Sequence, residues 1–314
     1  MTEHRHQHGE RGAAIILALL IMTVLATLAV SAISNHWAQQ RNDAIAPQIL
    51  QHEALLLAGQ QWAHAILIED ARHTAIDHLQ EDWAQPFPPT SLSALFNANN
   101  DSQWNDAALS VRIEDLTGKW NILSLRRASD DSQHMVLARK IAAMNGLPED
   151  TFIRLLDAVP PERNANWYGG SANLRSPQDP EACLRWLGFT PELLDKTQAM
   201  ITCLPNETAF NINTVSPFLL ELLVAPGIAQ DTLIARDNEP FSSLAEVVSR
   251  LNVPDTTFPF LVFGRPGVGW TVRSSWFAIH TDVRLDGIVW RTTQTVQRVG
   301  NTLQTLSTVT NNNN

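Results

Sequence analysis

The sequence lacks the short motifs that mark common classes of enzyme. It contains no Gly-x-Ser-x-Gly, no phosphate-binding Walker loop and no His-Glu-x-x-His, which mark serine hydrolases, nucleotide-binding enzymes and zinc peptidases respectively. The glycines Gly264, Gly267 and Gly269 form the reverse of a dinucleotide-binding fingerprint, and no strand–helix–strand pattern surrounds them. The sequence therefore predicts a loop at these glycines and no enzymatic activity for the chain.

Cysteine is also scarce. Cys183 and Cys203 are the only two, they lie twenty residues apart, and neither belongs to a Cys-x-x-Cys pair or to a Cys/His spacing suited to a metal. An exported domain can close such a pair into a disulfide, whereas a cytosolic enzyme usually keeps both thiols free. A Cys183–Cys203 disulfide is therefore predicted if the chain is exported.

Basic residues are outnumbered by acidic ones. The 314 residues hold 22 Lys and Arg against 32 Asp and Glu, a net charge of −10, so the chain would repel duplex DNA. The excess of carboxylates would suit cation sites, although solubility alone also explains it. With 44% hydrophobic and 17% charged residues, the composition is that of a globular protein with one large or two ordinary domains.

One segment has no charge at all. The run Ala13–Ser34 contains no Lys, Arg, Asp or Glu, and at about 1.5 Å per residue a helix of this length just spans a hydrocarbon core of roughly 30 Å. Arg5 and Arg11 precede the run, so the positive-inside rule leaves the short N-terminus in the cytoplasm and places the body outside it. The run predicts a single membrane-spanning helix.

An ordinary secretory signal is the alternative for the same segment. It would be cut after the small-residue pattern Val30-Ser31-Ala32, which would leave Ile33 as the mature N-terminus. However, the apolar run is longer than the usual core of a signal peptide. Helix-compatible sequence also continues to Ala46, since no Gly or Pro occurs between Gly12 and Pro47. These two features favour a helix that is kept.

The residues before the run, Glu10-Arg11-Gly12, resemble the cleavage site of type IV prepilins and type II secretion pseudopilins. In that family a dedicated inner-membrane peptidase cuts after the glycine, and the hydrophobic helix stays in the membrane. The resemblance implies that Gly12 ends a leader peptide, that Ala13 becomes the mature N-terminus, and that prepilin peptidase is a partner of the chain.

The fifth position after Gly12 narrows the resemblance. Most family members have Glu there, whose carboxylate meets the N-terminal amine of a neighbouring subunit, whereas this chain has Leu17. A subunit without that carboxylate leaves a buried charge without its partner. The K class of pseudopilins typically lacks the glutamate, in keeping with a place at the tip of the pseudopilus. The resemblance therefore implies a K-class membrane helix that packs on partner helices through Leu17, Leu20 and Leu25.

Further matches to the K class are spread along the chain. Gln60-Gln61-Trp62-Ala63 and the later Trp83-Ala84-x-Pro86 resemble a helix and a Trp-Ala-x-Pro element of that class. Asn121 in "GKWNILSL" matches one asparagine of a further element, in which the second asparagine is replaced by Leu123. Asn211, Asn213 and Thr214 in "FNINTVSP" match a third. The resemblance thus covers nearly the full chain.

The hydrophobic patterns predict an α+β fold in which helices separate two groups of strands. Period-two alternation predicts strands at Ala108–Asp115, Trp270–Leu285, Gly287–Val299 and Thr302–Val309, with a hairpin at Asp286-Gly287. Helical spacing predicts helices at His52–Asp82, Met135–Met144, Pro148–Ala158, Pro180–Leu187, Pro191–Ile201, Pro217–Leu223, Gln230–Arg236 and Ser242–Leu251. Pro86, Pro88 and Pro89 follow the first of these helices and are expected to end it.

This order is the one expected of a K-class pseudopilin. The resemblance implies a pilin-like long N-terminal transmembrane helix packed on an antiparallel sheet, with a large inserted all-helical domain. We expect a leader over residues 1–12, the transmembrane part of the helix over 13–34, a pilin-like domain over 35–120 and 266–310, and the inserted helical domain over 121–265.

One internal motif resembles a nucleic-acid-binding element. Pro226-Gly227-Ile228 between two short helices resembles a helix-hairpin-helix, whose backbone amides grip DNA phosphates in many proteins. Ala229 replaces the second glycine of the usual hairpin, and acidic residues surround the single Arg236. A structural hairpin is therefore expected, and a competence-type minor pilin that binds DNA through this element is the alternative.

Two sets of residues raise the question of a metal. The first combines three histidines and three aspartates, His64, His73, His78, Asp70, Asp77 and Asp82. A solvated helix face is expected there, with His73 and Asp77 one helical turn apart. Calcium is the second possibility, because pseudopilins commonly bind it through carboxylate and carbonyl oxygens. The usual acidic segment has lost residues here, which leaves Asp157, Glu162, Asp179 and Glu181 as candidates.

Taken together, the sequence predicts a minor pseudopilin of the K class, anchored once in the bacterial inner membrane with its body in the periplasm. Its expected partners are the minor pseudopilins of the I and J classes, prepilin peptidase and other inner-membrane components of the secretion system, and no nucleic acid. Its expected role is to prime and cap the pseudopilus for the export of folded proteins. A signal-anchored periplasmic enzyme remains a second alternative.

Overall fold

The computed structural model describes residues 50–92, 107–127, 132–157, 178–205, 208–254, 258, 269–285 and 287–313. The chain divides into two units, Met1–Ala54 and Leu55–Asn314, and all of the described strands lie in the second. Gly12, Ala13, Leu17, Leu20 and Leu25 are outside the described residues, as are Glu162, Gly264 and Gly267. Within the described ranges no helix has the length and apolarity needed to span a bilayer.

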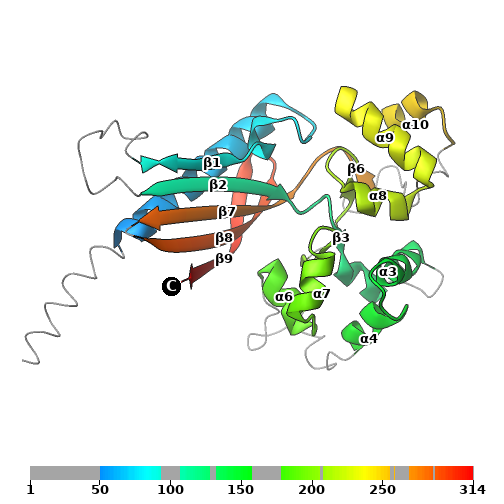
Figure 1. Cartoon of the computed structure of the whole chain (residues 1–314). Helices are drawn as coiled ribbons and strands as arrows, with labels where there is room; N and C mark the ends of the chain where they lie inside the picture. Colours follow the sequence, from blue (N-terminus) through cyan, green and yellow to red (C-terminus); the bar gives the residue numbers. More distant parts are fainter. Residues whose placement is uncertain are drawn as a thin grey trace, which may run out of the picture. The chain divides into compact units, whose positions relative to one another are not determined.

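A five-stranded sheet forms one layer of the second unit (Figure 1). Its strand order is β1-β2-β7-β8-β9, and each neighbouring pair is antiparallel. The strands are β1 (Phe87–Ser91), β2 (Ala108–Asp115), β7 (Trp276–Leu285), β8 (Ile288–Val299) and β9 (Thr302–Asn313). The antiparallel sheet together with the helices confirms the α+β class.

Three of the four predicted strands agree with this sheet except at their ends, whereas the predicted strand Trp270–Leu285 is interrupted and only Trp276–Leu285 belongs to the sheet. The strand at Ala108–Asp115 has the predicted bounds. The hairpin is also confirmed, because Leu285 pairs with Ile288 and Gly287 has a φ of 77°, a conformation that favours glycine. The last strand continues beyond Val309 to Asn313. Four further residues, which include asparagines, thus pair with β8 although asparagine is depleted in strands.

A helix covers residues 50–73 and is hereafter called the N-terminal helix; its residues 55–73 pack on one face of the sheet (Figure 1). Ala63 and Leu67 are fully buried on it and contact alternate residues of the strands, namely Val111, Ile113, Phe277, Ile279 and Val296. The helix approaches the sheet closely at Gly59, where a Cβ atom would lie 2.7 Å from Thr281 Cγ2. This packing is the helix-on-sheet layer that period 3.6 and period 2 predict for the two elements.

The prediction that this helix runs to Asp82 is wrong. It ends at residue 73, and a short 3₁₀ helix, η1 (Asp82–Ala84), follows after an irregular stretch. Thr74 accounts for the stop, because its hydroxyl donates to Ile76 O at 2.9 Å and contacts Glu81 Oε1 at 3.0 Å. The expected shared helical face of His73 and Asp77 is therefore wrong as well.

Helices occupy the sequence between β2 and β7, two strands that are neighbours in the sheet (Figure 1). They are the 3₁₀ helix η3 (Ile122–Arg127) and the α-helices α3 (Gln133–Met144), α4 (Thr151–Asp157), α6 (Pro180–Trp186), α7 (Pro191–Thr197), α8 (Pro217–Leu223), α9 (Pro226–Asn238) and α10 (Leu244–Leu251). They share one hydrophobic core, which includes Trp120, Phe152, Ile141, Leu220 and Phe241. The bounds predicted for the inserted helical domain and for the two parts of the pilin-like domain remain predictions.

Polar caps fix where these helices begin. The side chains of Ser132, Asp179, Thr190, Ser216 and Ser243 each accept a hydrogen bond from a backbone N–H of the first turn. Proline occupies the first turn of α6, α7 and α8, where its missing N–H costs nothing. These are the start signals that the sequence carries.

Two short parallel strand pairs lie apart from the five-stranded sheet, and of their four strands only β6 falls within a predicted strand. β3 (Trp120–Asn121) pairs with β4 (Ile201–Thr202), and β5 (Phe210–Asn211) pairs with β6 (Trp270–Thr271). The prediction of a helix through Ile201 is therefore wrong, because α7 ends at Thr197 and Trp120 N then donates to Met200 O at 2.7 Å. Each pair joins residues far apart in sequence, which local patterns cannot indicate.

Candidate functional site

A buried polar network lies where β2 ends and β7 begins. Asp115, the last residue of β2, is buried and its carboxylate accepts hydrogen bonds from the hydroxyls of Thr214 and Ser274 and from Thr117 N at 2.7 Å. Thr117 Oγ1 in turn accepts from the backbone N–H of Trp276 at 3.1 Å. Burial raises the pKa of Asp115 to about 6 despite these donors.

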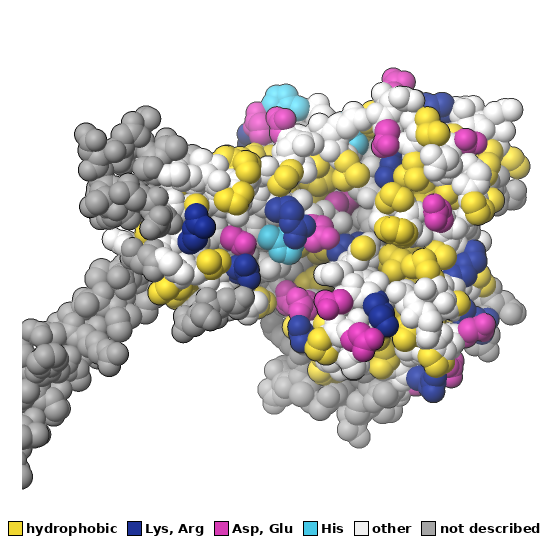
Figure 2. Space-filling view, in the orientation of Figure 1, with side chains coloured by type: hydrophobic (Ala, Val, Ile, Leu, Met, Phe, Trp, Pro, Cys, Tyr) yellow, Lys and Arg dark blue, Asp and Glu magenta, His cyan; other side chains and the backbone are white. Residues whose placement is uncertain are grey.

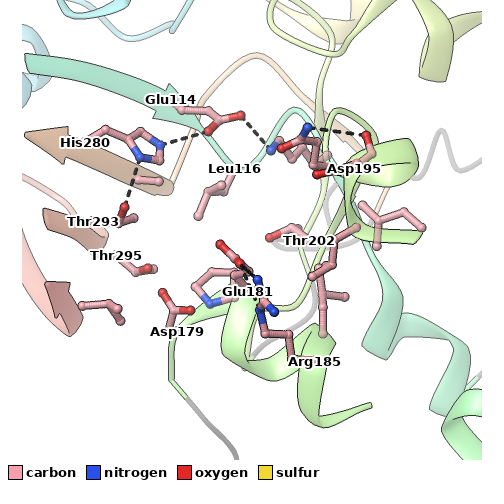
Figure 3. A pocket seen from close by; sticks show the side chains of 18 of the residues that line it. Glu114, Leu116, Asp179, Glu181, Arg185, Asp195, Thr202, His280, Thr293 and Thr295 are labelled. Carbon is pink, nitrogen blue, oxygen red and sulfur yellow. Dashed lines mark hydrogen bonds and ion pairs between the residues drawn. The ribbon is translucent and has the colours of Figure 1, made fainter. Parts of the chain in front are cut away.

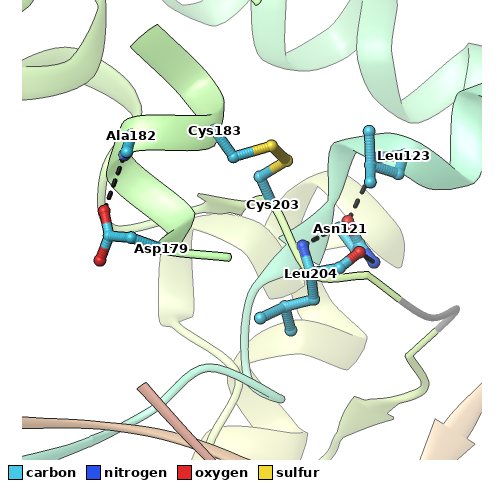
Figure 4. Close-up of a disulfide and its surroundings, with 7 residues drawn as sticks. All are labelled: Asn121, Leu123, Asp179, Ala182, Cys183, Cys203 and Leu204. Atoms are coloured by element: carbon cyan, nitrogen blue, oxygen red, sulfur yellow. Dashed lines mark hydrogen bonds between the residues drawn. A yellow bond between two sulfur atoms is a disulfide. The ribbon is translucent and has the colours of Figure 1, made fainter. Parts of the chain in front are cut away.

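The asparagines singled out in the sequence, Asn121, Asn211 and Asn213, hold segments of the helical region in place. Asn211 Nδ2 donates to Asp77 O at 3.0 Å and to Ser274 Oγ at 2.7 Å. Asn213 exchanges two hydrogen bonds with the backbone of Phe241, at 2.9 and 3.0 Å. Asn121 does the same with Leu204, at 3.0 and 3.2 Å (Figure 4). Buried amides with both groups satisfied specify a unique arrangement, so these residues are structural.

Arg298 on β8 connects the sheet to the end of the N-terminal helix. Its guanidinium donates to Asp70 Oδ2 at 2.9 Å, to Ser274 O at 2.9 Å and to Asp77 Oδ1. Burial, and then the nearby carboxylates of Glu81 and Asp77, raise the pKa of Asp70 to about 7. Sequence reasoning missed Arg298, although its period-two spacing from Gln294 and Val296 would have placed it on the buried face.

Asp70, Asp77 and Glu81 are close enough to hold a cation, since one oxygen of each lies within 4.8 Å of the others. The Arg298 guanidinium already contacts two of the three. A fixed arginine thus supplies the positive charge that such a cluster requires. Of the histidines proposed for a metal cluster, His64 contacts Gln294 Oε1 at 2.6 Å and His73 contacts Glu69 O at 2.9 Å. These contacts do not bring the histidines to a shared site.

The calcium candidates do not gather within the described residues. Asp179 caps α6 through Ala182 N at 2.7 Å, and Glu181 pairs with Arg185 at 2.6 Å. Asp157 is exposed at the end of α4. These three residues form no ligand group in the part of the chain that the structure describes, and their arrangement does not fit calcium. Because Glu162 and residues 158–177 lie outside the described ranges, the calcium site remains a prediction.

Cys183 on α6 and Cys203, just after β4, are joined by a disulfide with a Cα–Cα distance of 6.0 Å (Figure 4). Both cysteines are buried in the core of the helical region. The bridge therefore ties α6 to the segment that pairs with Trp120 and Asn121.

A cavity of about 320 Å³ lies between the other face of the sheet and helices α6 and α7 (Figure 3). Three of its charged groups lie close together. Glu114 Oε1 lies 2.7 Å from Lys119 Nζ, and Glu114 Oε2 lies 3.2 Å from His280 Nε2. Burial alone would raise the pKa of Glu114, but hydrogen bonds from His280 and Lys119 outweigh burial and lower it. Glu114 on β2, His280 on β7 and Lys119 in the turn after β2 thus form a charged, hydrogen-bonded cluster on the sheet side of the cavity.

The structure gives no support to DNA binding by the helix-hairpin-helix-like element. Only Val224 and Ala225 separate α8 from α9, and Gly227 and Ile228 belong to the first turn of α9 instead of an open loop. Arg236 is buried and donates to Ile212 O at 3.0 Å and Val215 O at 2.8 Å. The single cation near the motif thus faces inward, where it cannot meet a phosphate.

No protein-family model matches this chain. A search of curated proteins finds the type II secretion system protein K of Pseudomonas aeruginosa, 26% identical over 277 residues that cover 78% of each chain. A search of solved structures finds a chain of the GspK-GspI-GspJ complex from the type 2 secretion system of enterotoxigenic Escherichia coli. The TM-score is 0.56 at 15% identity, over 87% of this chain and 99% of that one. Both comparisons thus find proteins of type II secretion systems, the first by sequence and the second by fold.

Proposed function

We infer that this chain is a K-class minor pseudopilin of a type II secretion system. The observation that carries the inference is the similarity to protein K along most of both chains, and the shared fold supports it. The fold places helices between two neighbouring strands of an antiparallel sheet. This is the layout that the resemblance to the K class implies. The function is one of assembly, and the chain is a component of the secretion machinery instead of an enzyme.

The chain is made as a precursor and kept in the inner membrane. Prepilin peptidase cuts after Gly12, Ala13 becomes the N-terminus, and the charge-free helix Ala13–Ser34 spans the membrane once. Cleavage on the cytoplasmic side leaves the body in the periplasm. That compartment is oxidising, so the Cys183–Cys203 pair forms a disulfide there.

The subunit occupies the tip of the pseudopilus. Leu17 supplies no carboxylate for the N-terminal amine of a following subunit, so the chain is suited to the end of the helical stack. The seven α-helices described between β2 and β7 add bulk that a subunit inside a filament could not accommodate. From this position the chain primes assembly of the pseudopilus.

Its partners are the I-class and J-class minor pseudopilins. The similar Escherichia coli chain was crystallised in a complex with GspI and GspJ, and a chain with the same fold offers the same kind of surface. The membrane helices pack together through Leu17, Leu20 and Leu25. Other inner-membrane components of the secretion system contact the complex during assembly.

Deletion and co-isolation test this function together. Deletion of the gene should stop secretion of folded proteins into the medium while they accumulate in the periplasm, and the full chain supplied in trans should restore it. A tagged full chain should bring down the I and J pseudopilins from detergent-solubilised membranes. Undiminished secretion in the deletion strain, together with no I or J protein on the tagged chain, would contradict the function.

A further inference from the structure

A groove of about 680 Å³ runs between the end of the N-terminal helix, η1 and the start of β1. Its apolar wall combines two tryptophans, a phenylalanine, an isoleucine and two prolines: Trp62, Ile66, Trp83, Pro86, Phe87 and Pro88. Trp62 is 42% exposed, and its ring lies 5.1 Å from that of Phe87. Exposed aromatic side chains that line a concave surface mark sites of protein association.

The wall of the groove is already fixed in place. Trp83 is buried, and its Nε1 donates to Glu81 Oε2 at 2.7 Å. Its ring meets Phe277 of the sheet edge to face, with centroids 5.3 Å apart. The groove therefore needs no rearrangement before it is occupied, which removes one of the costs of association.

The remaining wall is acidic. Glu69, Asp70, Glu81 and Asp82 line it together with His73, and no Lys or Arg is among the lining residues. Figure 2 shows acidic side chains and a histidine gathered over the end of the N-terminal helix, with hydrophobic side chains beside them. Two arginines lie nearby, Arg72 against Glu69 at 3.1 Å and the buried Arg298 against Asp70 at 2.9 Å. Asp70 has a pKa raised to about 7 and is paired with Arg298, so the negative potential of the groove comes from Glu69, Glu81 and Asp82 against Arg72.

We propose that this groove receives a segment of a partner pseudopilin that inserts one bulky apolar side chain between Trp62 and Phe87 and carries Lys or Arg beside it. The apolar wall accommodates the inserted side chain, and the acidic wall pairs with the base at a short distance from it. Asp82 is exposed, and none of the ion pairs among the described residues includes it, so it supplies the carboxylate that pairs with the partner's base. The inference rests on the proposed function for the identity of the partner.

A second copy of this chain is a poorer occupant. Its acidic residues outnumber its basic ones by 32 to 22, so two copies repel each other as they approach through the acidic wall. The occupant of the groove therefore has to be a different chain, with a basic patch next to an exposed apolar side chain. We expect the I or the J pseudopilin to carry such a surface.

Photo-crosslinking within the full complex tests contact at the groove. A photoreactive phenylalanine at position 62 of the full chain, produced together with the I and J pseudopilins, should crosslink to one of them. The matched control places the same residue at Phe218, an aromatic position that is 61% exposed on α8. We expect a crosslink from position 62 that is at least about tenfold stronger than that from position 218. Equal yields, or none from position 62 in an assembled complex, would overturn the proposal.

Two substitutions separate the apolar part of the groove from the acidic part. Trp62→Ala should reduce co-isolation of the I and J proteins at least about tenfold, because a central aromatic anchor is lost. Asp82→Lys should weaken it and reduce its dependence on salt, since one attractive charge is replaced by a repulsive one. The matched control for charge is Asp237→Lys, at a position whose side chain is 76% exposed on α9, and it should bind as the native chain does.

The outcomes distinguish the inference from the function on which it rests. If the native chain brings down neither I nor J, both fail. If the native chain brings them down and the Trp62 and Asp82 variants do so equally well, only the groove proposal is overturned. Protease resistance of each variant, compared with the native chain, shows that the fold is retained.

Discussion

Arg298 on β8 donates a 2.9 Å hydrogen bond to Asp70 on the N-terminal helix, across 228 residues of sequence. Both side chains are almost fully buried, at 3% and 10% exposure. The same guanidinium contacts Asp77, which is 1% exposed. One arginine thus fixes the end of the N-terminal helix to the last hairpin of the sheet.

Removing this arginine should be costly. Arg298→Met leaves the carboxyls of Asp70 and Asp77 buried without their cation, and the loss of one partner of a buried pair costs about 3–5 kcal/mol. The free energy of unfolding, measured with urea on the full chain in detergent, should fall by that amount. Arg291→Met is the control, because Arg291 and Asp282 form an exposed pair at 3.3 Å that contributes at most about 1 kcal/mol. A similar loss of unfolding free energy in the two variants would contradict a stabilising role for the contacts of Arg298 with Asp70 and Asp77.

Asp115 should make stability depend on pH. Its pKa rises from 3.8 to about 6 in the folded chain, so the folded state holds a proton that the unfolded state has released. Such a group contributes stability below pH 4 that is lost as the pH rises through 6. At about 1.4 kcal/mol per pKa unit the loss is roughly 3 kcal/mol.

Comparison with a variant isolates this contribution. Asp115→Asn cannot titrate, so urea unfolding between pH 4 and pH 7 should show the native chain losing stability relative to the variant. The side-chain oxygen of asparagine can still accept the hydrogen bond from Thr117 N. The substitution therefore removes the titrating group with little rearrangement. Parallel curves for the two proteins across this range would show that Asp115 is not the group responsible.

Two glycines predict opposite effects of the same substitution. Gly59→Ala places a Cβ 2.7 Å from Thr281 Cγ2 and 3.1 Å from Leu109 Cδ1, so overpacking costing about 1–3 kcal/mol outweighs the helix propensity gained. Gly227→Ala meets no atom within 4 Å and should be neutral or stabilising by up to about 1 kcal/mol. Thermal unfolding of both variants checks the signs. Destabilisation by Gly227→Ala with none by Gly59→Ala would disagree with the packing of the helix on the sheet.

The disulfide should stabilise the helical region. Cys183 and Cys203 close a loop with a sequence separation of 20, for which restriction of the unfolded chain predicts about 3 kcal/mol. The double variant Cys183→Ala, Cys203→Ala should therefore unfold at lower urea concentration. Reductant should destabilise the native chain by a similar amount and leave the double variant unchanged. An effect of reductant on the double variant would show that it acts elsewhere.

Local signals in the sequence were enough for most of the elements. The alternation in "ALSVRIED" gives β2 its bounds, and Ser216 with Pro217 gives α8 its start. α9 begins at Pro226 and not at Gln230 as predicted. The proline was interpreted as part of a turn, whereas it fills the first helical position, for which its fixed φ is suited.

The remaining differences come from contacts that are distant in sequence. β1 was missed because Pro88 and Pro89 argue against a strand, but an edge strand tolerates proline where its N–H would face solvent. β4 was missed because its two residues pair with Trp120 and Asn121, far away along the chain. The groove beside Trp62 was missed for the same reason. Trp62 belongs to a motif that the sequence shows. Its neighbours in the groove, Trp83 and Phe87, come from other segments, and no local pattern indicates that these segments lie beside Trp62.

The mass of the mature chain tests the account's central claim most directly. Prepilin processing predicts that the protein isolated from membranes begins at Ala13, with the leader through Gly12 removed and the apolar helix retained. Intact-mass and N-terminal peptide measurements on the full-length protein give this result without any variant. A chain that begins at Ala13 supports a pseudopilin, whereas one that begins at Ile33, or one that retains Met1, would contradict it.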